Sequence, residues 1–157
     1  MPLCFAYGSN MDVAAMAARC PRSAMVGPAI LKRHRFFIMA SGFASVRRDP
    51  ARDVHGVLWD LALADVRALD RHEALDRGLY RKVSQAVVTP QGARRALVYV
   101  GASAVEGVPR ADYIAGIVAA ARAAGFAAKH VAELEAWGPR SGGAKVTPRL
   151  ATPFDRR

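Results

Sequence analysis

The chain has 157 residues, 52% of them hydrophobic and 23% charged, which is the composition of a folded globular domain and not of a disordered segment. Lysines and arginines outnumber acidic residues by 23 to 13, giving a formal net charge of +10. No apolar run reaches the ~18 residues that cross a membrane, and no signal peptide is recognisable, so we expect a cytoplasmic protein without a membrane partner. We predict one domain over residues 1–137 and a basic tail containing Pro and Gly over residues 138–157.

The positive charge is scattered over every segment, although the tail concentrates five basic residues against the single acidic Asp155. Such charge attracts phosphates weakly and without specificity. No helix-turn-helix, zinc-finger or RNA-binding pattern accompanies it. We therefore expect a solvated basic surface and no specific nucleic-acid partner, with weak polyanion binding as the alternative.

Cysteines and histidines show no spacing typical of metal ligands. Cys4 lies inside an apolar stretch and Cys20 stands alone, while the four histidines are isolated from one another. The sequence therefore predicts no metal site and no cofactor.

The predicted elements follow one another without a repeat or a dividing linker. Strands are expected at residues 3–6, 29–40, 44–47, 54–61, 79–89 and 94–101, and helices at residues 12–18, 65–74, 112–124 and 127–137. Asp12 is placed to cap the first helix, and Gly56 marks close backbone packing or a bulge. A hairpin is indicated by Pro90-Gln91-Gly92. The fold class is α+β.

The turn Gly8-Ser9-Asn10 follows the first predicted strand directly. Glycine tolerates positive φ, and Ser and Asn hydrogen-bond their own backbone, so the chain turns sharply here. Such a turn leaves N–H groups without strand partners, and these can receive an oxyanion or a carboxylate. An ordinary strand-ending turn is the alternative.

Glu73 is the second candidate functional residue. In the helix predicted over residues 65–74, Val66 and Leu69 define the buried face, and Glu73 follows Leu69 by four residues on that face. Asp65 is expected to face solvent. Burial would raise the pKa of the Glu73 carboxyl toward the range of a general base. Alternatively, the side chain swings into water or pairs with Arg77.

Three tyrosines form the third candidate group. Tyr80 and Tyr99 fall on consecutive predicted strands, and Tyr113 begins the next helix. Buried tyrosines commonly give the hydroxyl a single protein partner, so a structural role is one interpretation. A polar pocket lined by phenol groups is the other.

Four segments together resemble the γ-glutamylcyclotransferase (AIG2-like) family. They are Phe5-Ala6-Tyr7-Gly8-Ser9-Asn10-Met11, Val54-His55-Gly56-Val57-Leu58-Trp59, Leu69-Asp70-Arg71-His72-Glu73 with Gly78-Leu79-Tyr80, and Ala96-Leu97-Val98-Tyr99-Val100. The resemblance implies a small mixed β-barrel-like sheet flanked by helices, with a cavity at one end. Downstream, Pro109-Arg110-Ala111-Asp112-Tyr113 and the helices to Trp137 resemble the branch that includes enzymes of glutathione metabolism and γ-glutamylamine enzymes.

The resemblance also implies an activity: intramolecular aminolysis of a γ-glutamyl amide to 5-oxoproline and a free amine or amino acid. Glu73 then takes the role of general acid and base. The substrate-binding residues it implies are Tyr7, Gly8, Ser9, Asn10, Met11, Tyr80, Tyr99 and, with a looser match in spacing, Tyr113. The reaction needs no metal, cofactor or covalent enzyme intermediate.

Two other functions remain open at this level. One is removal of a γ-glutamyl protecting group from a biosynthetic amine, and the other is a non-catalytic module that binds an acidic glutamyl metabolite. Specificity for the leaving amine is expected to depend on loops such as residues 41–53 and 101–112. The shapes of these loops do not follow from the sequence. The chain is expected to act as a monomer or a homodimer.

Overall fold

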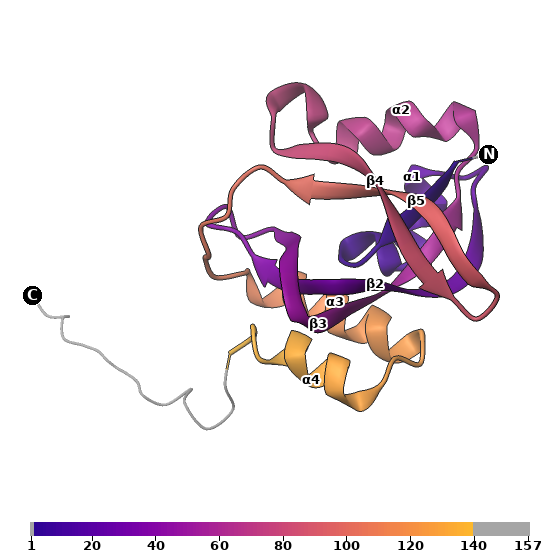
Figure 1. The fold of residues 1–157 in the computed structure, drawn as a ribbon. Helices are drawn as coiled ribbons and strands as arrows, with labels where there is room; N and C mark the ends of the chain where they lie inside the picture. The colour runs from indigo at the N-terminus through magenta and orange to yellow at the C-terminus, as the bar shows by residue number, and fades with distance from the viewer. Residues whose placement is uncertain (1, 140–157) are drawn as a thin grey trace, which may run out of the picture.

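The computed structural model describes residues 2–139 and shows a closed barrel of five strands in the order β1-β3-β2-β4-β5, flanked by four helices (Figure 1). The strands are β1 (Leu3–Ala6), β2 (Ala24–Ile38), β3 (Ala44–Asp60), β4 (Tyr80–Thr89) and β5 (Gly92–Gly101). The helices are α1 (Val13–Arg19), α2 (Leu63–His72), α3 (Ala111–Ala123) and α4 (Ala128–Glu135), with 3₁₀ turns η1 (Ser9–Met11) and η2 (Leu75–Arg77). The predicted α+β class and barrel-like sheet are confirmed. All but the first two residues of the predicted basic tail lie outside the described residues.

None of the helices within residues 2–139 is long and apolar enough to cross a membrane.

Two long antiparallel hairpins, β2–β3 and β4–β5, form most of the barrel, and β1 pairs with β3. The barrel closes at two places with a single registered pair each. Cys4 of β1 is paired with Leu97 of β5, and Ile30 of β2 is paired with Val88 of β4. We call these the β1–β5 seam and the β2–β4 seam. Within residues 2–139 these strands have no other registered pair with each other, so the barrel is least tightly closed at the two seams.

The strand predictions need two corrections. The strand predicted at residues 29–40 is β2, which begins five residues earlier, at Ala24, and ends at Ile38. Residues 44–47 and 54–61 belong to one continuous strand, β3. The charged stretch between them, which includes Pro50, breaks the apolar pattern that the prediction followed. This part of β3 is largely exposed, and the register with β2 shifts between Lys32 and His34, where Arg33 has φ 60°. A bulge tolerates Pro and charged residues because they need not fill a ladder position.

Gly56 marks a close backbone approach, as predicted. A Cβ atom at this position would lie 2.4 Å from the carbonyl oxygen of Ala6 and 2.6 Å from Cζ of Phe5. The absence of a side chain at Gly56 therefore allows β3 to pack closely against β1, the strand that leads into the Gly8-Ser9-Asn10 turn.

Gly56→Ala is expected to lower the free energy of unfolding by about 1–3 kcal/mol or more, because the clash involves backbone and a buried ring. The matched control is Gly116→Ala in α3, where an added Cβ meets nothing within 4 Å. That control should be stabilising by roughly 0.5–1 kcal/mol, since alanine is the better helix former. Urea denaturation of both variants checks the pair, and equal stability would contradict the packing argument.

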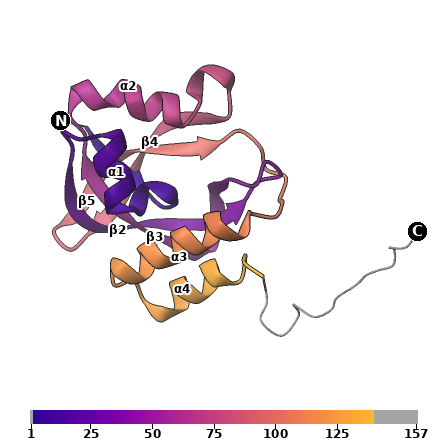
Figure 2. The same ribbon diagram turned by 180° about the vertical axis from the view of Figure 1, so that it is seen from behind.

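The helices cover opposite sides of the barrel. Helices α3 and α4 lie against β2 and β3, while α2 lies on the other side, beside β4 (Figure 2). The buried residues of α3 are Ile114, Ile117, Val118 and Ala121, which recur at helical spacing along one face. Asp12 caps α1, as predicted, by accepting a hydrogen bond from the N–H of Ala15 at 3.0 Å.

Asp65 is not solvent-exposed as expected, because only 5% of its surface is accessible. Its Oδ2 accepts hydrogen bonds from the N–H of Arg22 at 2.9 Å and from Oγ of Ser23 at 2.8 Å. The carboxylate therefore ties the start of α2 to the segment after α1. These partners are some forty residues away in sequence, so helical periodicity could not reveal them.

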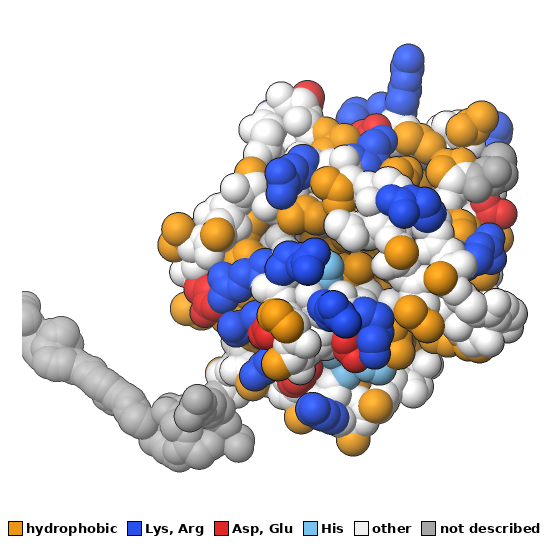
Figure 3. All heavy atoms as spheres, in the orientation of Figure 1, with side chains coloured by type: hydrophobic (Ala, Val, Ile, Leu, Met, Phe, Trp, Pro, Cys, Tyr) orange, Lys and Arg blue, Asp and Glu red, His pale blue; other side chains and the backbone are white. Residues whose placement is uncertain are grey.

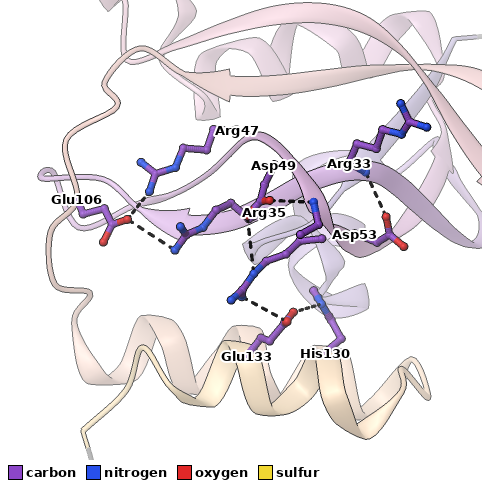
Figure 4. Close-up of polar contacts among 10 residues, drawn as sticks. Arg33, Arg35, Arg47, Asp49, Asp53, Glu106, His130 and Glu133 are labelled. Carbon is purple, nitrogen blue, oxygen red and sulfur yellow. Dashed lines mark hydrogen bonds and ion pairs between the residues drawn. The ribbon is translucent and has the colours of Figure 1, made fainter.

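A ring cluster joins α4 to β3. His130 of α4 is 3% exposed and stacks on His55 with ring centroids 4.9 Å apart, and Phe126 covers both. Among the described residues 2–139, neither ring nitrogen of His130 makes a hydrogen bond, although Nδ1 lies 3.5 Å from Oε1 of Glu133 (Figure 4). Burial, together with the neighbouring His55, lowers the pKa of His130 to about 4, against the smaller opposing effect of Glu133.

Stability should therefore fall between about pH 6.5 and pH 4. The unfolded chain binds a proton at this histidine near pH 6.5, whereas the folded protein binds it only near pH 4. The free energy of unfolding then decreases by up to ~1.4 kcal/mol per pH unit in this window and is unaffected by His130 above it. Denaturation at several pH values should show a shallower dependence for His130→Phe, and identical slopes would contradict the expectation.

Candidate functional site

A cavity of about 270 Å³ opens at the β1–β5 seam. Its walls come from the end of β1, the turn η1, the C-terminal end of α2, the start of β4 and the start of α3. Eight of the nine predicted site residues line it: Tyr7, Gly8, Ser9, Asn10, Glu73, Tyr80, Tyr99 and Tyr113. The fold thus brings together groups that lie up to about a hundred residues apart in the sequence.

The Gly8-Ser9-Asn10 turn forms the start of η1. Its two turn hydrogen bonds run from the N–H of Met11 to the carbonyl of Gly8 and from the N–H of Asp12 to the carbonyl of Ser9. Within residues 2–139, no acceptor is found for the N–H groups of Gly8, Ser9 and Asn10. Gly8 has φ −124°, so the turn does not use the positive φ that a glycine permits. The expected unpartnered N–H groups are present.

Asn10 connects the turn to the rest of the site. Its side-chain Nδ2 donates to Oε1 of Glu73 at 2.8 Å, and its Oδ1 accepts from Nη1 of Arg19 at 2.5 Å. Its backbone carbonyl accepts a hydrogen bond from Nε1 of Trp59 at 3.0 Å. Because Asn10 is 7% exposed and its side-chain and carbonyl groups are bonded, its amide holds the carboxylate and the guanidinium at a fixed separation.

Glu73 follows the last residue of α2, which ends at His72 and not at Ala74 as predicted. The N–H of Glu73 still donates to the carbonyl of Leu69, so the side chain keeps the inward direction that the helical spacing indicated. Its carboxylate bonds to Asn10, whereas the alternative partner, Arg77, makes no ion pair with it in the described chain. Burial raises the pKa of Glu73 to about 7, while the Asn10 hydrogen bond and the Arg19 charge act in the opposite direction.

The hydroxyls of the four tyrosines make hydrogen bonds that connect the segments forming the cavity wall. Tyr7 donates to the carbonyl of Tyr99 at 2.5 Å, and Tyr80 donates to the carbonyl of Ala44. Tyr99 donates to Oδ1 of Asp70, and Lys82 holds the same carboxylate at 3.0 Å. Burial raises the pKa of the Tyr7, Tyr80 and Tyr99 phenols, so these groups stay protonated at neutral pH.

Tyr113 differs from the other three tyrosines. Its hydroxyl oxygen accepts a hydrogen bond from the N–H of Ala44 at 3.0 Å, and its own hydrogen has no acceptor within residues 2–139. An ideal Cβ on Gly8 would lie 3.9 Å from this oxygen, so the phenol stands next to the turn. Tyr113 is therefore free to donate a hydrogen bond to a molecule in the cavity.

Met11, the ninth predicted site residue, does not line this cavity. It is 2% exposed and borders a separate hollow between α1 and α3. Eight further lining residues were not predicted as site residues, and two of them, Arg19 and His72, have basic side chains. A signal for Arg19 does exist, because it is the only charged side chain in the apolar stretch from Val13 to Cys20.

Comparison with known proteins gives a match to the model of the AIG2-like family over residues 53–134, just over half of the chain. The chain belongs to the AIG2-like family. This region includes Glu73, Tyr80, Tyr99 and Tyr113, whereas the turn lies before it. The family resemblance noted in the sequence is thereby confirmed.

A human relative named γ-glutamylcyclotransferase is 28% identical over 100 residues, which cover 57% of this chain and 53% of that protein. The chain thus spans about half the length of this curated relative. Among solved structures, one described as a γ-glutamyl cyclotransferase superposes with a TM-score of 0.81 at 24% identity, covering 93% of each chain. An uncharacterized human protein superposes with a TM-score of 0.80 at 25% identity over 88% of this chain and 89% of that one. This AIG2-like chain therefore shares the fold of that γ-glutamyl cyclotransferase.

Proposed function

We propose that this protein is a γ-glutamylcyclotransferase, which converts a γ-glutamyl amide into 5-oxoproline and a free amine or amino acid. The observation that carries the proposal is a buried carboxyl, Glu73, with its pKa raised to about 7 and hydrogen-bonded to a turn whose N–H groups are unpartnered. AIG2-like family membership and the fold shared with a γ-glutamyl cyclotransferase support this type of activity.

Glu73 begins the reaction as a general base. The α-amine of the substrate is an ammonium at neutral pH and cannot attack until it loses a proton. A carboxylate with a pKa of about 7 is well matched to take that proton at physiological pH. The freed amine then adds to the γ-carbonyl of the same molecule, and the intramolecular geometry supplies the proximity advantage.

The turn would stabilise the oxyanion that forms on the γ-carbonyl oxygen. The N–H groups of Gly8, Ser9 and Asn10 are fixed before the substrate arrives, and such preorganised donors are typically worth ~3 kcal/mol each. Tyr113 can add a hydroxyl donor beside them. Glu73 then passes its proton to the departing amine, and the C–N bond of the γ-amide breaks.

Arg19 would bind the α-carboxylate of the glutamyl group. In an α-amino acid, the amine and the carboxylate are attached to the same carbon, so their two partners in the enzyme must be close to each other. Glu73 and Arg19 meet this requirement because they bond to opposite ends of the Asn10 amide. Arg19 has no ion-pair partner within residues 2–139, and it lines the cavity.

A panel of substrates tests the proposal directly. The protein is incubated with γ-glutamyl amino acids, glutathione and γ-glutamylamines, and 5-oxoproline is measured by mass spectrometry. Release of 5-oxoproline supports the proposal, and the substrate that reacts fastest identifies the leaving group, including a protected biosynthetic amine. Binding of 5-oxoproline without turnover on any member would instead favour a non-catalytic module and overturn the proposal. A cytoplasmic location stays a prediction from the sequence.

A further inference from the structure

The β2–β4 seam opens into a second hollow of about 360 Å³. Within residues 2–139, β2 and β4 have no registered pair beyond Ile30–Val88, although β4 is paired with β5 along its whole length and β2 is paired with β3 except at Val26 and Arg33. The hollow lies between these two unpaired edges, away from the cavity that contains Glu73. It shares no lining residue with that cavity.

The floor of this hollow is apolar. Leu31 and Phe37 line it from β2, and Val83, Val98 and Val100 line it from β4 and β5. Leu31, Phe37 and Val98 are almost completely buried. The volume lies within the range of sites for small organic molecules.

The rim of the hollow is basic, and no acidic residue is among the described residues that line it. Arg47 and Arg48 line it from β3 and Arg81 lines it from β4, so arginines border the hollow on both sides. Arg47 stacks on the Phe37 ring, with Cζ 4.4 Å from the ring centroid, and pairs with Glu106 outside the hollow (Figure 4). Lysine and arginine side chains gather across the middle of this face, with hydrophobic atoms between them (Figure 3).

Arg48 and Arg81 are available for a ligand. Both are exposed, and neither side chain makes a hydrogen bond or an ion pair within residues 2–139. A guanidinium binds a carboxylate or phosphate head group through two parallel hydrogen bonds. Two unpaired guanidinium groups above an apolar floor therefore favour a molecule with an anionic head and an apolar body.

We propose that the hollow at the β2–β4 seam is a second binding site, for a small amphiphilic anion whose apolar body lies on the Leu31–Val98 floor and whose head group contacts Arg48 and Arg81. Its occupation does not depend on the proposed cyclotransferase reaction. The site and the catalytic cavity use different residues, so each can be tested without the other.

Decanoate is the test probe, and 1-decanol is its neutral counterpart with the same chain length. Amide chemical shifts are followed by NMR during each titration. Decanoate is expected to shift the amides of Val83, Val98 and Val100, whereas 1-decanol should bind at least about tenfold more weakly. Equal binding of the two molecules, or no shift in this region up to about 1 mM decanoate, overturns the proposal.

Charge-reversal variants distinguish binding of decanoate at this hollow from general electrostatic attraction of decanoate to a basic protein. The double variant Arg48→Glu/Arg81→Glu should weaken decanoate binding by about tenfold or more. The matched control is Arg94→Glu/Arg95→Glu, which changes the net charge equally at exposed positions of β5 outside the hollow. The control should bind decanoate within about twofold of the unmodified protein at 0.15 M salt, where distant charges are screened. An equal loss in both double variants overturns the proposal, and thermal denaturation verifies that both are folded.

Discussion

Glu73→Gln is expected to lower kcat by about 10²–10⁴-fold, which is the usual contribution of a positioned general base. Glutamine has the shape of glutamate and can keep a hydrogen bond with the Asn10 amide, but it cannot take a proton from the substrate amine. KM and the melting temperature should change little, because the cavity keeps its walls. Steady-state measurement of 5-oxoproline release checks this result, and full activity in the variant would contradict the mechanism.

The pH dependence of the same reaction gives a second measurement of the role of Glu73. Since the base form is the active one, kcat/KM should rise with pH and level off above about pH 7, the pKa of Glu73. The matched control is Asp70→Asn, one turn earlier on α2 and outside the cavity lining. The negative charge of Asp70 raises the pKa of Glu73, so its removal should retain turnover and move the rising limb to lower pH.

The sequence predicts the parts of the site that depend on local chain geometry. The spacing from Leu69 placed Glu73 on the inner side of α2, and the turn residues after β1 indicated unpartnered N–H groups. Both properties follow from a few neighbouring residues, so no knowledge of the tertiary structure is needed. The helix end was misplaced by one or two residues because a residue at the C-cap, such as Glu73, continues the helical pattern in sequence.

The contacts that complete the site are non-local, and this is why the sequence did not reveal them. The Asn10 amide reaches Glu73 across 63 residues, and the Tyr7 hydroxyl reaches Tyr99 across 92. The place of Arg19 in the site can be recognised only in the folded structure, where α1 packs beside the end of α2. The same reasoning explains β3, whose charged middle could be assigned to a strand only through its partner β2.

Arg19→Ala is expected to lower kcat/KM for a γ-glutamyl amide by about 10- to 100-fold, since hydrogen bonds to a charged partner are worth ~1.5–3 kcal/mol. The loss should depend on the α-carboxylate of the substrate. The 4-aminobutanoyl amide of the same amine lacks only that carboxylate and cyclises to 2-pyrrolidinone, so it serves as the comparison substrate. The unmodified protein should prefer the γ-glutamyl amide by a similar factor, and Arg19→Ala should largely abolish this preference.

Arg19 also lowers the pKa of Glu73, so its removal has a second effect that must be separated from carboxylate binding. A raised pKa slows both substrates equally at neutral pH, whereas loss of the carboxylate contact slows the γ-glutamyl amide alone. Arg19→Lys provides the control, because it keeps the positive charge but loses the planar fork that binds a carboxylate through two hydrogen bonds. If Arg19→Ala slowed both substrates by the same factor, Arg19 would only position Asn10 and Glu73. A loss confined to the γ-glutamyl amide would instead make Arg19 the residue that selects substrates with a free α-carboxylate.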